Sequence, residues 1–91
     1  MAWLIRGARL LDPARGVDRT GDVLIDGGRV AKVGGEIRVD GEPETIEAAG
    51  LVLSPSFVDM HVHLREPGRE DAETIESGTR AAAAGGFGAV A

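Results

Sequence analysis

The sequence predicts an α/β protein. A small β-domain, a half-sandwich over residues 1–55, leads into a strand–helix–strand unit over residues 56–91. Two observations carry this prediction. Short apolar runs separated by Gly and Pro fill the first half, and such runs are typical of strands. In the second half an alternating segment, a polar loop, an alanine-rich segment and another apolar run follow one another, which is the order of a βαβ unit.

The first half contains several short strands with turn residues between them. The run "WLIRGARLLD" stops at Asp12 because Pro13 cannot donate a ladder hydrogen bond. Two apolar runs, residues 23–25 and 30–33, flank "DGGR" and predict a hairpin, since glycine adopts positive φ without steric cost. The segment "TIEAAGLVLSP" predicts two more strands around Gly50.

The second half changes from strand to helix and back. "FVDMHVHL", residues 57–64, alternates and predicts a strand that carries Asp59, His61 and His63 on one face. "REPGRED" predicts a loop. "AETIESGTRAAAAGG" predicts a helix from about Ala72 that ends at the Gly pair, and "FGAVA" predicts another strand.

A parallel sheet that begins in this way is normally continued, because its strands are buried on both faces. A (β/α)₈ barrel needs roughly 250 residues. We therefore expect the chain to be the N-terminal fragment of a larger protein, with residues 56–91 as the start of such a barrel.

Composition excludes several classes of function. The 91 residues are 43% hydrophobic and 27% charged, which suits one small globular core. Fifteen acidic against ten basic residues, a net charge of −5, argue against nucleic-acid binding. The absence of cysteine excludes disulfides and thiolate metal sites. No apolar run reaches the ~20 residues of a membrane span and no signal peptide is visible, so we expect a cytoplasmic protein without a membrane partner.

His61 and His63 are the only histidines and are candidate metal ligands. On a strand they share a face with Cα atoms roughly 6.5–7 Å apart, which lets both imidazoles reach one ion. Neutral imidazole suits zinc and related divalent metals. Asp59 on the same face, or residues outside this chain, are the candidates for further ligands. The alternative is a pair of ordinary surface histidines.

Arg65 follows at the end of the same strand. Its guanidinium can bind a carboxylate through two parallel hydrogen bonds. The alternative is a surface salt bridge with one of three nearby acids, Glu66, Glu70 or Asp71. Beside a pair of metal ligands, recognition of an anion is the favoured interpretation.

The segments "VDMHVHLREPGRED" and "GTRAAAAGGF" together resemble the dihydroorotases of the amidohydrolase superfamily. "GDVLIDGGRVAKVG" is similar to the small β-domain that precedes the barrel in that superfamily. The resemblance implies a TIM-type metal-dependent hydrolase barrel, of which residues 56–91 supply strand 1, helix 1 and the start of strand 2. It also implies a zinc-dependent cyclic amide hydrolase of pyrimidine biosynthesis, which interconverts N-carbamoyl-L-aspartate and dihydroorotate by a metal-activated hydroxide.

The resemblance further implies roles for single residues. His61 and His63 would hold one or two zinc ions. His63 and Arg65 would bind the substrate, and Arg65 would do so by pairing with the substrate carboxylate. No catalytic residue is expected within the chain, because the family's general base and remaining ligands would lie beyond Ala91. The chain alone is therefore expected to be inactive. A homo-oligomer is expected, with aspartate carbamoyltransferase as a candidate partner.

Three alternatives stay open. Allantoinase- and hydantoinase-type relatives share the histidine pair but usually lack an arginine at position 65. Non-catalytic dihydroorotase-like scaffolds of aspartate carbamoyltransferase tend to lose the histidines. A stand-alone binding module is disfavoured by the interrupted sheet. Two residues depart from the family pattern: Ser56 stands where glycine is usual, and Gly88 lies in a strand that is usually rich in threonine.

Overall fold

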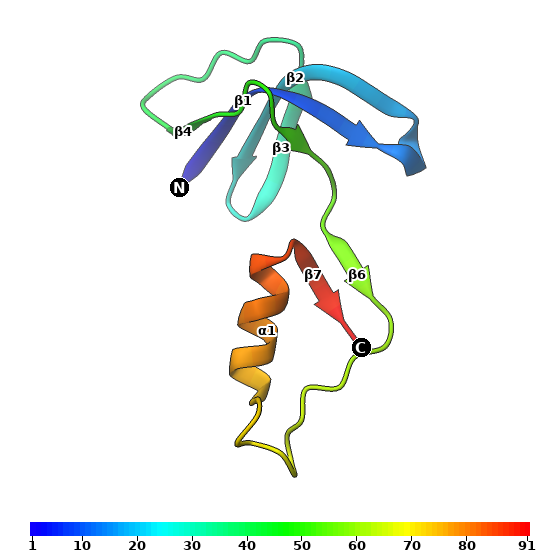
Figure 1. Ribbon diagram of the computed structural model, residues 1–91. Coiled ribbons are helices and arrows are strands. Elements are labelled where there is room, and N and C mark those ends of the chain that lie inside the picture. The colour runs from blue at the N-terminus through cyan, green and yellow to red at the C-terminus, as the bar shows by residue number, and fades with distance from the viewer. The chain divides into compact units, whose positions relative to one another are not determined.

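The computed structural model describes residues 1–91 and divides the chain into two compact units, Met1–Pro55 and Ser56–Ala91. Figure 1 shows the elements of each unit. The first unit contains strands without an α-helix, and the second contains the single α-helix of the chain between two strands. No helix has the length and apolar character that crossing a membrane requires.

The first unit is one five-stranded sheet. Its central strand pairs antiparallel with the next strand, which pairs antiparallel with the third, while two short strands run parallel to the central one (Figure 1). The strands are β1 (Ala2–Asp12), β2 (Val17–Asp26), β3 (Arg29–Gly34), β4 (Glu44–Glu47) and β5 (Val52–Leu53). The predicted β-domain is confirmed, and so are the strand end at Asp12 and the two short strands around Gly50.

Glycine makes the predicted hairpin between β2 and β3. Gly27 and Gly28 have φ values of 60° and 75°, the left-handed conformations that a two-residue hairpin turn with the twist of the flanking strands requires. After β1 the chain turns through a short 3₁₀ segment, Pro13–Arg15, which ends at Gly16.

A bulge in β1 decides which side chains form the core. The register of β1 against β2 shifts between Ile5 and Ala8, and Gly7 takes a φ of 72° there. The extra residue moves the alternation of side chains by one position. Ala8 and Leu10 therefore join the cluster that Ile5 packs against, whereas Leu4 belongs to a second cluster.

The second unit is a βαβ unit. Strand β6 (Phe57–Asp59) pairs parallel with β7 (Phe87–Val90), and helix α1 (Ile75–Ala84) connects them (Figure 1). The Phe57 and Phe87 rings lie 5.5 Å apart between centroids and join the two strands. The helix ends at Gly85, as the sequence predicts.

The strand predicted over residues 57–64 is too long, since β6 ends at Asp59. The Asp59 side chain accepts a hydrogen bond from the His61 N–H at 3.1 Å and so competes with the ladder. Ala91 donates to the Asp59 carbonyl and accepts from the Val62 N–H, a step of three residues where a regular ladder has two. The chain beyond β6 is thus extended but irregular.

The helix begins at Ile75, three residues later than Ala72, where the sequence predicted it. Thr74 is its N-cap, and its hydroxyl accepts from the Ser77 N–H while the Ser77 hydroxyl accepts from the Thr74 N–H. This reciprocal cap ends the preceding turn, in which Ala72 and Glu73 donate to the Arg69 carbonyl instead.

Candidate metal and substrate site

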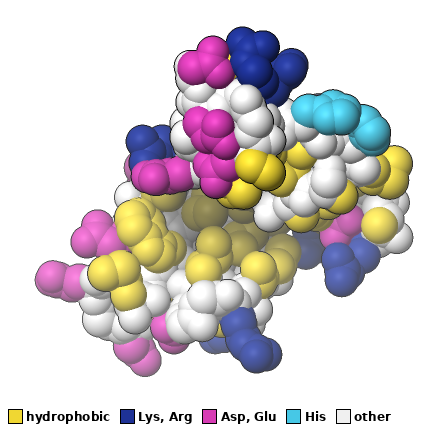
Figure 2. Space-filling view, turned by 90° about the horizontal axis from the view of Figure 1, so that it is seen from below, with side chains coloured by type: hydrophobic (Ala, Val, Ile, Leu, Met, Phe, Trp, Pro, Cys, Tyr) yellow, Lys and Arg dark blue, Asp and Glu magenta, His cyan; other side chains and the backbone are white.

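The two histidines lie in the extended segment that follows β6. Val62 and Leu64 are half-buried, whereas His61 and His63 are exposed, so the alternation between the two faces holds over these four residues. Figure 2 shows the two imidazoles side by side on the surface. The segment therefore presents both rings to the same side, as the sequence predicted from their spacing.

The imidazoles are close enough to share one ion. Their Nε2 atoms are 3.1 Å apart and the ring centroids 4.9 Å. Two nitrogen ligands at about 2.0–2.1 Å from a tetrahedral zinc ion lie roughly 3.3 Å from each other. The separation found in the protein thus matches two ligands of one divalent ion. It also allows a hydrogen bond between the rings, with one Nε2 protonated and the other accepting.

Asp59 does not complete a metal site. The sequence left it open as a third ligand on the histidine face, but its Oδ1 accepts from the His61 backbone. Asp59 is half-buried, whereas both histidines are exposed. No group of three or more His, Cys, Asp or Glu side chains in the structure could hold a metal ion.

The guanidinium of Arg65 is exposed and has no partner in the structure. No ion pair includes it, and it donates no hydrogen bond. The three acids that could have neutralised it are all engaged elsewhere: Glu66 accepts from the Ile75 N–H, Glu70 from the Gly68 N–H, and Asp71 from the Arg69 guanidinium. The surface salt bridge that competed with anion binding is therefore not formed.

The same contacts keep the neighbouring carboxylates charged. The hydrogen bond from Gly68, with one from its own backbone N–H, lowers the pKa of Glu70. The Arg69 side chain lowers the pKa of Asp71. Both acids are ionised at neutral pH, yet they are turned toward the loop and its backbone rather than toward Arg65.

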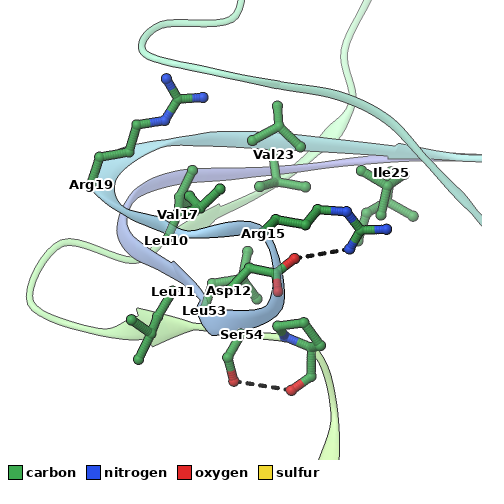
Figure 3. A pocket seen from close by; sticks show the side chains of 13 residues that line it. Leu10, Leu11, Asp12, Arg15, Val17, Arg19, Val23, Ile25, Leu53 and Ser54 are labelled. Carbon is green, nitrogen blue, oxygen red and sulfur yellow. Dashed lines mark hydrogen bonds and ion pairs between the residues drawn. The ribbon is translucent and has the colours of Figure 1, made fainter.

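The β-domain contains a hollow of about 700 Å³ (Figure 3). Aliphatic side chains of β1, β2, β3 and β5 line most of it, and the Asp12 carboxylate in its wall is paired with Arg15 at 2.9 Å. It contains no histidine and no unpaired carboxylate, so it offers neither a metal ligand nor a general base.

Comparison with known proteins agrees with the resemblance seen in the motifs. The family model described as dihydro-orotase-like matches residues 50–91. A dihydroorotase of Syntrophotalea carbinolica is 56% identical over 91 residues, all of this chain and 21% of the relative. A dihydroorotase of Geobacter metallireducens is 50% identical over 91 residues, which are 22% of its length.

Solved structures share the fold. A prolidase in complex with N-methylphosphonate-L-proline matches with a TM-score of 0.73 and 26% identity, covering 99% of this chain and 25% of that one. A protein described as uncharacterized matches with a TM-score of 0.63 and 31% identity, over 70% of this chain and 16% of that one.

The chain spans about a fifth of the length of the curated relatives it matches, and all of its own length takes part in the match. The resemblance that the motifs predicted is confirmed: the chain is similar throughout to a portion of the dihydroorotases.

Proposed function

We propose that the complete protein carrying this sequence is a dihydroorotase that interconverts N-carbamoyl-L-aspartate and dihydroorotate. One observation carries the proposal: an unpaired guanidinium follows two imidazoles whose Nε2 atoms lie 3.1 Å apart. Dihydroorotate has a ring amide for the metal end of such a site and a carboxylate for the arginine end. The dihydroorotases to which the chain is 50–56% identical support the same assignment.

The residues of the chain fit a divalent ion such as zinc, one or two ions per site. A bound zinc ion would supply a Lewis acid and an acidic water. His61 and His63 would bind it through Nε2, so each ring must carry its proton on Nδ1. The remaining ligands and the general base come from outside these residues, because no third ligand stands beside the pair.

Arg65 would hold the substrate carboxylate. Its planar guanidinium offers two parallel donors, and no protein carboxylate has to be displaced before a substrate carboxylate can bind. His63, two residues before, would contact the same substrate from the metal side.

The βαβ unit would be the start of a (β/α)₈ barrel. In such barrels catalytic groups gather beyond the carboxyl ends of the strands. His61 and His63 follow the carboxyl end of β6, which is where the first strand of a barrel would present its ligands. We further propose a cytoplasmic homo-oligomer, with aspartate carbamoyltransferase as a candidate partner.

Substitutions in the complete protein test the proposal. His61→Ala or His63→Ala should remove most bound zinc and nearly all activity, because each imidazole supplies a direct bond to the ion. Arg65→Lys should keep the zinc, because Arg65 is not a proposed zinc ligand. It should weaken substrate binding, because lysine retains the charge but loses the two parallel donors of the planar guanidinium. Losing a charge-assisted hydrogen bond costs about 1.5–3 kcal/mol, or roughly tenfold or more in kcat/KM for dihydroorotate.

The measurements are zinc content and steady-state kinetics with dihydroorotate and with a cyclic amide that lacks the carboxylate. Equal losses on the two substrates would show that Arg65 is structural, and the choice of dihydroorotase over allantoinase- or hydantoinase-type relatives would fail with it. A zinc-loaded protein that hydrolyses neither substrate would instead indicate a non-catalytic scaffold.

A further inference from the structure

Arg65 lies between two residues that are both anchored on helix α1. On one side, Leu64 packs on the helix backbone at Gly78, which is buried: a methyl group at Gly78 would lie 2.7 Å from Leu64 Cδ2. On the other side, Glu66 Oε1 accepts a hydrogen bond from the Ile75 N–H at 3.2 Å. One anchor is thus at the N-terminal end of the helix, and the other lies three residues further along it.

The backbone of Arg65 needs such support. Its φ is 68°, and it is the single residue other than glycine with a positive φ. This left-handed conformation is uncommon for residues with a Cβ and persists only where the surroundings impose it. The Arg65 carbonyl also accepts from the Arg69 N–H at 2.8 Å, which closes the turn that Arg65 begins.

Glu66 satisfies a donor that the helix cap leaves over. The reciprocal cap between Thr74 and Ser77 uses the N–H groups of those two residues. The Ile75 N–H, in the first turn of α1, has no partner within the helix. A carboxylate is favoured at this end because the helix dipole is positive there. The hydrogen bond from the Ile75 N–H to Glu66 is thus separate from the two hydrogen bonds of the Thr74–Ser77 cap.

We propose that Glu66 is a positioning residue for Arg65. Its hydrogen bond to the Ile75 N–H, together with the Leu64 contact at Gly78, holds Arg65 in the left-handed conformation that directs the guanidinium to the substrate carboxylate. This inference rests on the proposed function, because it presumes that Arg65 binds a substrate carboxylate.

The test compares Glu66→Ala, Glu66→Gln and Arg65→Ala with the wild type in the complete, zinc-loaded protein. Glu66→Ala should raise KM for dihydroorotate about threefold to tenfold, the range that one net hydrogen bond accounts for, with most of the loss in KM rather than kcat. Glu66→Gln should recover most of it, since the amide oxygen still accepts from Ile75. Adding Glu66→Ala to Arg65→Ala should change KM little further.

Glu76→Ala is the matched control. It removes the same charge from the first turn of α1, but Glu76 pairs with Arg80 and does not touch the Arg65 turn. An unchanged KM in Glu76→Ala is expected. Three results would overturn the proposal: a lower melting temperature of Glu66→Ala with an unchanged KM, full additivity with Arg65→Ala, or an equal rise of KM in Glu76→Ala.

A failure of the proposed function would look different, because the wild type itself would not turn over dihydroorotate. The NMR order parameter of the Arg65 Nε–H group, measured by relaxation, then tests the positioning independently of activity. Loss of order in Glu66→Ala and its recovery in Glu66→Gln would support the role of Glu66. Equal order in all three proteins would refute it.

Discussion

At the scale of single residues, Asp22 connects three separate parts of the β-domain. It is the one buried charged residue, 5% exposed. Its Oδ1 accepts from the Gly7 N–H at the bulge of β1, and its Oδ2 accepts from the Ile37 N–H in the loop after β3. The hydrogen bonds from Ile37 and Gly7, helped by the charge of Arg6, lower the pKa of Asp22 against the opposing effect of burial.

Replacing Asp22 by Asn should destabilise the β-domain by about 1–3 kcal/mol, because one of the two N–H groups would face an amide NH₂ and lose its acceptor. The folded-state pKa of Asp22 is lowered, so its contribution is fully present above the unfolded-state pKa of about 4 and is lost as pH falls through the folded value. The free energies of unfolding of Asp22→Asn and wild type should therefore differ at neutral pH and converge in acid.

Asp18→Asn is the control for this substitution. Asp18 is also a carboxylate of β2, but it is exposed and pairs with Arg9 at the surface, where solvent screens the pair, so its replacement should change stability far less than Asp22→Asn does. Faster hydrogen exchange of the Gly7 and Ile37 amides in Asp22→Asn would report the loss of their hydrogen bonds to Asp22. Equal effects of the two substitutions, or a difference that grows toward low pH, would contradict the role assigned to Asp22.

At the scale of elements, the pairing of β6 with β7 depends on a glycine. A methyl group at Gly88 would lie 2.2 Å from Ser56 Oγ and 2.8 Å from Ser56 Cβ. Gly88 therefore leaves room for the Ser56 side chain beside β7. The two departures from the family pattern, Ser56 and Gly88, meet in space: the hydroxymethyl group of one occupies the room that the other leaves free.

Gly88→Ala should consequently destabilise the βαβ unit by roughly 1–3 kcal/mol through overpacking. Ser56→Gly should relieve most of this, so a double-mutant cycle in the complete protein should show coupling above about 0.5 kcal/mol. Gly35→Ala is the control, since a methyl group there meets nothing within 4 Å and Gly35 has no positive φ. Additive effects of Ser56→Gly and Gly88→Ala would show that the contact carries no energy.

The sequence predicts some elements better than others. An element is predicted well when the residues that fix its conformation lie within it, and poorly when a distant side chain fixes it. The β2–β3 hairpin is predicted correctly because Gly27 and Gly28 encode their own turn. The bulge of β1 is not, since it is held by Asp22, fifteen residues from Gly7. The end of β6 is missed because the Asp59 side chain competes with the ladder, which an alternating pattern does not reveal.

The same distinction applies to the site. The close approach of His61 and His63 follows from their spacing in an extended chain. The unpaired state of Arg65 depends on where three acidic side chains turn, and its conformation depends on contacts with α1. Neither is visible in the order of residues, so the sequence indicates Glu66 only as a salt-bridge partner. An acidic residue in the loop that leads to a capped helix is the signal that could have pointed to it, although Glu70, Asp71 and Glu73 share this signal.

At the scale of the whole chain, apolar side chains remain uncovered in both units. In the second unit Phe57, Val58 and Met60 are 57%, 64% and 85% exposed. In the first, Val30 and Val33 of β3 are exposed beside the apolar hollow shown in Figure 3. A two-stranded sheet such as β6–β7 is marginally stable by itself, and its free edges can pair with other chains.

We therefore expect the 91 residues, produced alone, to self-associate and to lack hydrolase activity even with added zinc. Exposed apolar surface and free strand edges drive the association, and two imidazoles without a third ligand or a general base cannot complete the site. Sedimentation velocity measures the association, and a dihydroorotate assay on the same sample measures the activity.

Replacing Val58 and Met60 by Lys should reduce association without restoring activity. Glu76→Lys, an equal gain of positive charge on an already polar position, should leave association nearly unchanged. A monodisperse monomer that melts cooperatively would show that the two units need no further covering, and turnover by that monomer would show that the histidine pair suffices for catalysis.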